Sequence, residues 1–373
     1  MDDDGGEGTV QAVDSYSRAK KLNYSPVFTL YGHSRSISSL CFSPDGLLLA
    51  SASADRTAKV WSLRSGTLLQ TFKGHQGGIS DIAWSPCSRY IASASDDRSI
   101  VVWHVKEGYD VRHFLGHTSY VFCVAYSPQS NLIASGSFDE TVRLWNARSG
   151  TCHRTIAAHS EAVTDVDFNC DGTLIASCSY DGLIRLWDVP TGQCLATLPH
   201  PTSSPTTSIR FSPSSSHLLA SSLDSTLRLW DVANGKVVKT YKTEKPHIDP
   251  AVAQGDASIR DPGDTGRSFF QNEKFAIKSS FLIRRSATND ERPEVYVITG
   301  SEDCKVYIWD LQSRTLATVL AGNHRDVVGA IAAHPTRPIL ASAALDHDLS
   351  IKVYLDVSTS ISAASSAEDT GSS

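Results

Sequence analysis

Tryptophans recur along much of the chain at an almost constant spacing, and this period limits the possible folds more than any other feature. Trp61, Trp103, Trp145, Trp187 and Trp230 are separated by 42, 42, 42 and 43 residues. The same period separates four histidines, namely His33, His75, His117 and His159. Between them lie short apolar strands separated by turn residues, without helical periodicity. The repeat therefore predicts an all-β array of small sheets.

Two further units continue the array. A sixth ends at residues 306–310, and a seventh covers residues 323–354, with Tyr354 in place of tryptophan. A unit of this length with Gly-His near its start and Trp-Asp near its end resembles the WD repeat. Seven such units predict a seven-bladed WD-repeat β-propeller, because closing the ring protects the sheet edges.

The last unit contains only three strands, so its fourth must come from elsewhere. Residues 27–31, before the first histidine, have a suitable pattern, and we expect this N-terminal strand to complete the last blade and close the ring. The propeller is predicted over residues 24–355, with polar insertions at 242–271 before blade six and at 284–293 within it. Residues 1–23 (an acidic tail) and 356–373 are too polar to offset the entropy of ordering and are predicted to be disordered.

Composition excludes several function classes. The formal net charge is −6, and the basic residues are scattered, which argues against direct nucleic-acid binding. None of the eight cysteines forms a C-x-x-C pair, so a zinc site is not expected. No apolar run is long enough to span a membrane, and the polar N-terminus does not resemble a signal peptide. The cysteines indicate a reducing compartment.

Each full unit brings together histidine, serine, aspartate and tryptophan, for example His117, Ser135, Asp139 and Trp145. A Ser-His-Asp set suggests a hydrolase, but it recurs in nearly every unit, whereas catalysis needs one exposed copy beside an oxyanion hole. We interpret the set as a structural network that pins loops. The other network residues are His33, Asp55, Trp61, His75, Asp97, Trp103, His159, Asp181 and Trp187. No phosphate-binding loop is present, so neither an enzyme nor a cofactor is predicted.

Positions that differ between units and face outward are candidates for recognition. Five residues after the blade histidine, the units carry Ser38, Ser80, Phe122, Thr164 and Gly329, with Ser208 and Lys278 assigned to units five and six. The position before the turn aspartate varies equally, as Ala54, Asp96, Phe138, Tyr180, Leu223, Glu302 and His347. An aromatic ring with a carboxylate nearby at the mouth of the channel suits a cationic side chain, although Phe122 as a simple plug of the channel is the alternative.

At these residues the chain resembles the WD repeat protein 5 family, which are scaffold subunits of SET-domain histone methyltransferase complexes (COMPASS and its relatives). The resemblance covers roughly residues 24–354 and includes variable rim segments at 78–81, 120–123, 135–140, 272–274 and 300–303. It implies that the channel mouth binds an arginine side chain of the methyltransferase or of the histone H3 tail. The matching positions are Ala54, Ser80, Asp96, Phe122, Phe138, Thr164, Tyr180, Phe275 and Ala276.

Lys278 is the main departure from the family, which clamps the guanidinium between two phenylalanines. We expect the lysine either to lie along Phe122 with its charge directed outward, or to be compensated by Phe269 or Phe270 as a substitute wall. In either case we expect Lys278→Phe to strengthen arginine binding.

The resemblance also implies a second partner groove on the opposite face, between blades five and six. Its matching positions are Leu229, Lys239, Phe281, Ile283 and Gln312, whereas Ser214 and His217 depart from the family. These positions imply a nuclear, non-catalytic scaffold, a monomer within a complex, whose partners are a SET-domain methyltransferase subunit, other COMPASS-type subunits and the histone H3 tail. The alternative is a substrate receptor of a ubiquitin ligase or another multi-complex adaptor.

Overall fold

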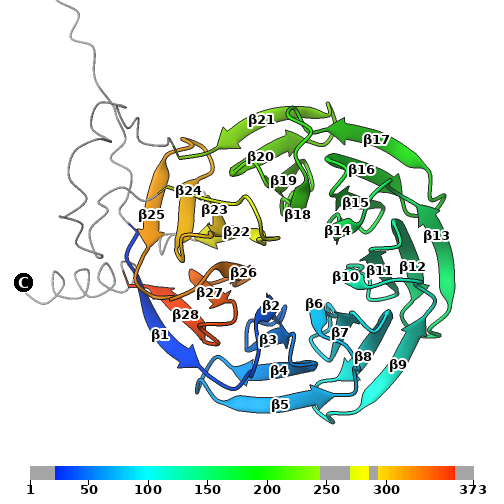
Figure 1. Ribbon diagram of the computed structural model, residues 1–373, viewed down its shortest axis with the longest axis horizontal. Helices are drawn as coiled ribbons and strands as arrows, with labels where there is room; N and C mark the ends of the chain where they lie inside the picture. Colours follow the sequence, from blue (N-terminus) through cyan, green and yellow to red (C-terminus); the bar gives the residue numbers. More distant parts are fainter. Residues whose placement is uncertain (1–21, 244–268, 285–292, 358–373) are drawn as a thin grey trace, which may run out of the picture.

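The computed structural model describes residues 22–243, 269–284 and 293–357, and in these residues 28 strands form seven four-stranded antiparallel sheets. Figure 1 shows the sheets arranged as the blades of a ring, with the first strand of each repeat nearest the centre. The prediction of a seven-bladed propeller is confirmed. The cores of the two predicted insertions and most of the predicted tails lie outside the described residues.

Blades one to three follow the chain from the innermost to the outermost strand. Blade one contains β2 (Ile37–Phe42), β3 (Leu48–Ser53), β4 (Thr57–Ser62) and β5 (Leu68–Lys73). Blade two contains β6 (Ile79–Trp84), β7 (Tyr90–Ser95), β8 (Ser99–His104) and β9 (Asp110–Leu115). Blade three contains β10 (Val121–Tyr126), β11 (Leu132–Ser137), β12 (Thr141–Asn146) and β13 (Cys152–Ala157).

Blades four to six repeat this order. Blade four contains β14 (Val163–Phe168), β15 (Leu174–Ser179), β16 (Leu183–Asp188) and β17 (Cys194–Pro199). Blade five contains β18 (Thr206–Phe211), β19 (His217–Ser222), β20 (Thr226–Asp231) and β21 (Lys236–Tyr241). Blade six contains β22 (Ser279–Arg284), β23 (Glu294–Gly300), β24 (Val306–Asp310) and β25 (Leu316–Leu320).

Blade seven joins the two ends of the described chain. Its inner strands are β26 (Val328–Ala333), β27 (Ile339–Ala344) and β28 (Ile351–Asp356), and its outermost strand is β1 (Tyr24–Leu30). Leu22 and Asn23, assigned to the tail by the sequence, belong to the fold. Leu22 is buried among blades six and seven, and the Asn23 amide donates to Asp356. Asp356, likewise assigned to a tail, is fully buried.

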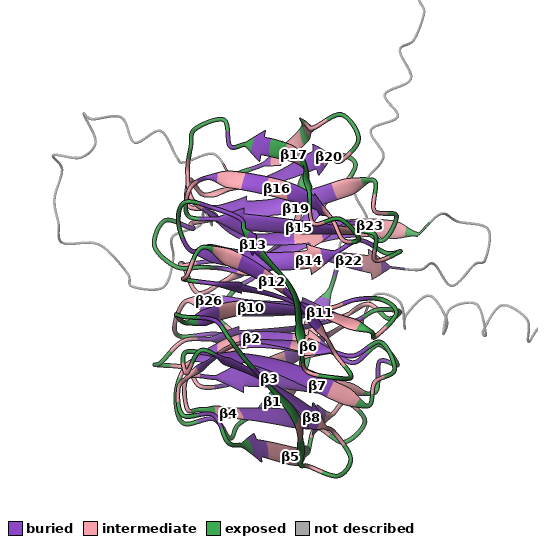
Figure 2. Ribbon diagram, turned by 90° about the vertical axis from the view of Figure 1, so that its right-hand side faces the viewer, coloured by how far each residue is buried: buried purple, intermediate pink, exposed green. Residues whose placement is uncertain are grey.

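The apolar core is divided among the interfaces between neighbouring blades. The interface of blades one and two, for example, contains Val60 and Phe72 of one blade and Ile82, Trp84 and Ile91 of the next. The second strand of each blade is buried on both faces (Figure 2), whereas the outermost strands of blades two to four are largely exposed. Each blade is therefore held by its two neighbours, as in other repeat architectures.

A β-bulge near the start of the innermost strand sets the residues at the channel mouth. Six of the seven blades have one, and the bulged residues are Ser38, Ser80, Phe122, Thr164, Thr207 and Gly329. The assignment of Ser208 to this position was wrong, because Ser208 is buried and pairs with Ser221, one residue further along β18. Strand β22 pairs from its first residue, Ser279, without such a bulge.

Candidate functional site

The recurring polar set forms a buried network in blades one to four. In blade three, His117 Nδ1 lies 2.8 Å from Asp139 and His117 Nε2 lies 2.8 Å from Ser135 Oγ, which accepts a hydrogen bond from the Trp145 indole at 2.8 Å. Burial alone would raise the pKa of Asp139, but hydrogen bonds from His117, Thr141 and the Thr118 amide outweigh burial and hold that pKa well below its usual range.

This geometry links two loops to the blade rather than exposing a nucleophile. Ser135 is completely buried, and its hydroxyl oxygen is shared by an imidazole and an indole. The same contacts join His33, Asp55, Ser51 and Trp61 in blade one, and His159, Asp181, Ser177 and Trp187 in blade four. In blade two they join His75, Asp97, Ser93 and Trp103.

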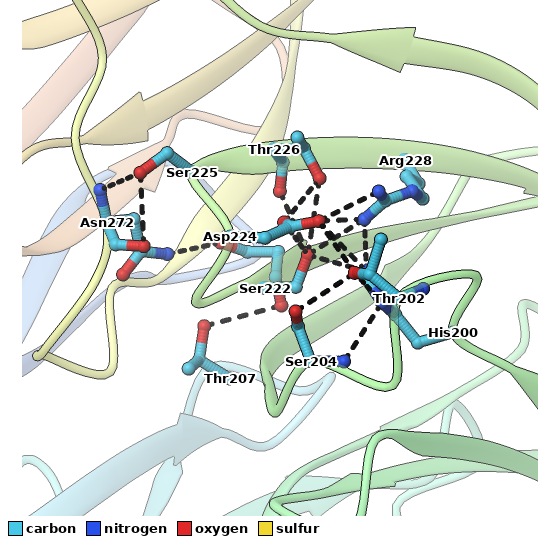
Figure 3. A network of polar contacts seen from close by, with 11 residues as sticks. His200, Thr202, Ser204, Thr207, Ser222, Asp224, Ser225, Thr226, Arg228 and Asn272 are labelled. Atoms are coloured by element: carbon cyan, nitrogen blue, oxygen red, sulfur yellow. Dashed lines mark hydrogen bonds and ion pairs between the residues drawn. The ribbon is translucent and has the colours of Figure 1, made fainter.

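Blade five contains a different network, shown in Figure 3. Ala220 replaces the shared serine, and the Trp230 indole has no hydrogen-bond partner. Arg228 instead contacts His200 and donates to Asp224 at 2.8 Å, while Ser222 connects the histidine to the aspartate. Burial and the neighbouring Arg228 guanidinium lower the pKa of His200, so the ring is neutral near pH 7.

The network of blade five extends into the segment that enters blade six. The side-chain Nδ2 of Asn272 donates to Ser221 Oγ at 3.0 Å, and the backbone N–H of Asn272 donates to Ser225 Oγ (Figure 3). Phe270, proposed from the sequence as a wall of the channel mouth, packs instead on Tyr307 and Trp309 and is buried. It fills the core of blade six, and that proposal was wrong.

A cavity of about 260 Å³ opens at the channel mouth. Nine of the ten residues predicted to bind arginine line it, namely Ala54, Ser80, Asp96, Phe122, Thr164, Tyr180, Phe275, Ala276 and Lys278. The tenth, Phe138, is half-exposed and packs on Phe122 with 6.0 Å between ring centroids. The bulged residue Thr207, which the sequence analysis missed, also lines the cavity.

The rim of this cavity combines an aromatic ring with a carboxylate. Phe122 presents a half-buried ring that packs on the ring of Phe138. The Phe138 ring in turn packs on Tyr120, with 6.4 Å between the ring centroids. Asp96 is exposed and accepts a hydrogen bond from Ser80 Oγ at 3.0 Å, so its position is fixed as well. A ring and an oriented carboxylate are the two groups that attract a guanidinium.

Lys278 lines the same cavity, but its charge lies deeper in the channel. Its Nζ lies 3.1 Å from Asp165 Oδ1 and 3.4 Å from Asp81 Oδ2. Burial alone would lower the pKa of Lys278, but these two carboxylates outweigh burial and raise it, so the ammonium is charged and paired. The expectation that this charge points outward was wrong, because the ammonium pairs with the two buried carboxylates.

Asp81 and Asp165 belong to the innermost strands β6 and β14 and are almost fully buried. Each accepts a backbone hydrogen bond from the next blade, Asp81 from Val124 and Asp165 from Ile209. The Arg210 guanidinium lies 3.5 Å from the same Asp165 oxygen, Oδ1, that Lys278 contacts. Sequence reasoning missed this channel cluster, although both aspartates stand six residues after their blade histidines and share the 42-residue register.

The residues of the predicted second groove are distributed between core and surface. Leu229 and Phe281 are buried in the interface of blades five and six, whereas Ser214 and Gln312 are exposed. His217 and Ile283 are half-buried. Lys239 spans the interface, since its Nζ donates to the carbonyl oxygens of Leu311 at 2.6 Å and Gln312 at 3.0 Å.

The histidine, cysteine, aspartate and glutamate side chains of the described ranges form no group able to hold a metal ion. Likewise, these ranges contain no helix with the length and apolar character needed to cross a bilayer.

Comparison with known proteins places the chain among the propellers. Residues 29–253 match the WDR5 beta-propeller domain, and residues 293–310 match the WD domain, G-beta repeat. An uncharacterized WD repeat-containing protein of Schizosaccharomyces pombe, C713.05, is 33% identical over 84 residues, which is 22% of this chain and 25% of the relative. Protein Mut11 of Chlamydomonas reinhardtii is 37% identical over 60 residues, 16% of each chain.

These alignments span a quarter or less of the two relatives, so the family match carries more weight. That match covers more than half of the chain and includes the blades that provide Phe122, Asp96, Asp81 and Asp165. Together with seven observed blades, it shows that the chain belongs to the WDR5 β-propeller family of protein-interaction scaffolds.

Proposed function

We propose that the chain is a nuclear, non-catalytic scaffold subunit of a histone H3-tail lysine methyltransferase complex of the COMPASS type. In this role its channel mouth binds an arginine-containing peptide from the methyltransferase or from the histone H3 tail. Other subunits of the complex occupy its opposite face.

The observation that carries the proposal is the combination of groups at the mouth. Phe122 offers a ring face, Asp96 offers an oriented carboxylate, and the cavity between them has a volume of about 260 Å³. An arginine side chain entering there stacks its guanidinium on the ring and pairs with the carboxylate. A lysine side chain stacks less well, because its ammonium is compact and strongly hydrated.

Lys278 does not oppose this binding as strongly as its charge suggests. Its ammonium is paired with Asp165 and Asp81 below the mouth, although the residue also lines the cavity. The pocket therefore has one aromatic wall, Phe122, where the family has two. We expect weaker arginine binding than in members with two rings, since one stacking contact contributes about 0.5–2 kcal/mol.

The test is a titration of a fluorescent peptide that carries one arginine between alanines, together with the same peptide carrying lysine. Wild-type protein should prefer arginine. Phe122→Ala should weaken arginine binding by about 1–2 kcal/mol, roughly five- to thirtyfold, and Asp96→Asn should weaken it less. Tyr109→Ala, which removes a half-exposed ring on the opposite face, is the matched control and should change nothing.

Equal binding of the two peptides, or unchanged affinity in Phe122→Ala, would contradict the proposed site. The complex itself is tested by affinity purification from the native host. SET-domain subunits should be recovered with the wild-type chain and lost with Phe122→Ala. Recovery of cullin adaptors instead would favour a ubiquitin-ligase receptor and reject the methyltransferase role.

A further inference from the structure

A second cavity, of about 620 Å³, lies between blades one and two. Its floor is apolar and includes the half-buried Leu48 and the buried Val60, and one wall is the outermost strand β5 with Leu69. The opposite wall consists of the β6–β7 and β8–β9 turns of blade two, with Arg89 and Lys106. We call this cavity the blade one–two groove. Strands β5 and β8, which flank it, are neighbours at the bottom of the ring in Figure 1.

At several of the other interfaces, a side chain of the outermost strand donates hydrogen bonds to the next blade. In blades one to five, one residue of the outermost strand pairs with the residue that precedes the blade tryptophan. We call this position on the outermost strand the latch position. In blades one to five the latch residues are Gln70, Arg112, Arg154, Ala196 and Lys239. Three of these are long cations that point toward the next blade.

Each of these three cations donates to carbonyl oxygens of the next blade's outer turn. Arg112 reaches the Arg148 carbonyl at 3.1 Å, Arg154 reaches Pro190 at 2.9 Å, and Lys239 reaches Gln312 at 3.0 Å. The latch side chain therefore crosses the interface and occupies the space between the blades.

Blade one has the shorter, neutral Gln70 at this position. Within the described part of the chain, no hydrogen bond joins Gln70 to the turn of blade two. Its amide lies against Gly108, so close that a Cβ on that residue would overlap it. Leu48 therefore remains partly exposed above the buried Val60, and Leu69 stays 53% exposed.

The charges around the groove indicate what covers it. Arg89 and Lys106 are both exposed on the wall of blade two, and they outnumber Glu107, the one acidic side chain that lines the cavity. An apolar floor beside two exposed cations is complementary to an apolar side chain with flanking carboxylates. We propose that the blade one–two groove binds an extended peptide of a partner protein, with a branched apolar residue in the cavity and adjacent Asp or Glu facing Arg89 and Lys106.

This surface is independent of the channel mouth and of any arginine peptide bound there. Its blade-two wall is formed by the β6–β7 and β8–β9 turns, which lie at the opposite ends of these strands from the β7–β8 turn that carries Asp96. The scaffold thus gains a further contact point for a partner. Failure of the arginine site would leave the groove proposal intact, and the reverse also holds.

The experiment uses the full chain and a random heptapeptide phage library, because the natural partner is unidentified. Selection on wild-type protein is paired with counter-selection on Gln70→Arg, which copies the latch residues Arg112 and Arg154 and fills the groove. Peptides that pass both steps should share a Leu, Ile or Val beside Asp or Glu. Synthetic copies should bind wild-type protein at least about tenfold more tightly than Gln70→Arg.

Three further variants make the result decisive. Leu69→Glu changes a side chain that is exposed, so it should keep the fold and repel the acidic peptides. Arg89→Glu combined with Lys106→Glu should reverse the preference toward basic peptides. Phe122→Ala should bind the selected peptides as wild type does. Selection of no peptide that distinguishes wild type from Gln70→Arg, or of peptides rich in lysine and arginine on wild-type protein, would overturn the proposal.

Discussion

Replacing Lys278 by methionine tests the channel cluster most directly. Methionine keeps a stem of similar length but removes the ammonium that lies between Asp165 and Asp81, at 3.1 and 3.4 Å. Breaking a buried ion pair by removing one partner costs roughly 3–5 kcal/mol. Asp165 keeps Arg210 at 3.5 Å, and Asp81 keeps hydrogen bonds from Ser39 and Val124. We therefore expect the low end of that range, about 3 kcal/mol at pH 7.

The assay is thermal unfolding followed by circular dichroism. With an unfolding entropy of about 2.1 cal/mol/K per residue over roughly 300 folded residues, a loss of about 3 kcal/mol lowers Tm by about 5 °C. Lys59→Met is the matched control, because Lys59 is also buried but donates only to Thr71. Burial lowers the pKa of Lys59, so its replacement should leave Tm unchanged or raise it.

The pH dependence supplies a second measurement. Because Lys278 and Arg210 outweigh burial and hold the pKa of Asp165 below its usual value, the pair contributes stability at neutral pH that is lost as pH falls through this lowered pKa. In Lys278→Met the carboxyl is protonated at a higher pH, so the deficit against wild type should shrink on acidification. A deficit that is constant with pH, or equal Tm values at pH 7, would refute the assignment of this charge pair.

Lys278→Phe is still expected to strengthen arginine binding, but it should also lose stability, because it removes the ammonium paired with Asp165 and Asp81, so its affinity must be compared at matched fractions of folded protein. Deleting residues 24–31 removes β1 and should lower Tm markedly, since it exposes the edge of β28; an unchanged Tm would contradict this. Asp139→Ala leaves His117 without its acceptor and should cost about 1–3 kcal/mol in urea unfolding, whereas an unchanged midpoint would mean that the network adds no stability. Burial raises the pKa of Asp167 to about 6, although the Arg210 guanidinium lowers it. The neutral carboxyl is therefore favoured in the folded state, and its contribution to the free energy of unfolding, present below the ordinary carboxyl pKa, is lost as pH rises through about 6. Asp167→Asn should remove this dependence when Tm is measured from pH 4.5 to 7.5.

The blades were predictable because most of them repeat the same residues at the same spacing. Tryptophan, histidine and turn aspartate return in register, and a buried network of that kind needs the same spacing every time. Blade five departs where Ala220 replaces the shared serine, and this substitution was visible in the sequence. The partner that takes over, Arg228, was not predicted, because an arginine also stands near this position in blades that keep the serine.

The ion-pair partners of Lys278 could not be predicted without the three-dimensional arrangement. Its partners Asp81 and Asp165 come from blades two and four, across the channel, and no local pattern joins them to blade six. Phe270 was misplaced for a similar reason, since an apolar residue after a polar insertion fits a pocket wall and a blade core equally well.

The pairing of β1 with β28 also sets the order in which the molecule can be completed. The Asn23 amide and the Asp356 side chain that it contacts are 333 positions apart in the sequence. At a synthesis rate of about 5–20 residues per second, β1 leaves the ribosome roughly 15–70 seconds before its partner exists. During that interval β1 has no β28 to pair with. Pro26, which has no backbone N–H to donate, interrupts its hydrogen-bonding edge and disfavours pairing with a foreign strand during this interval.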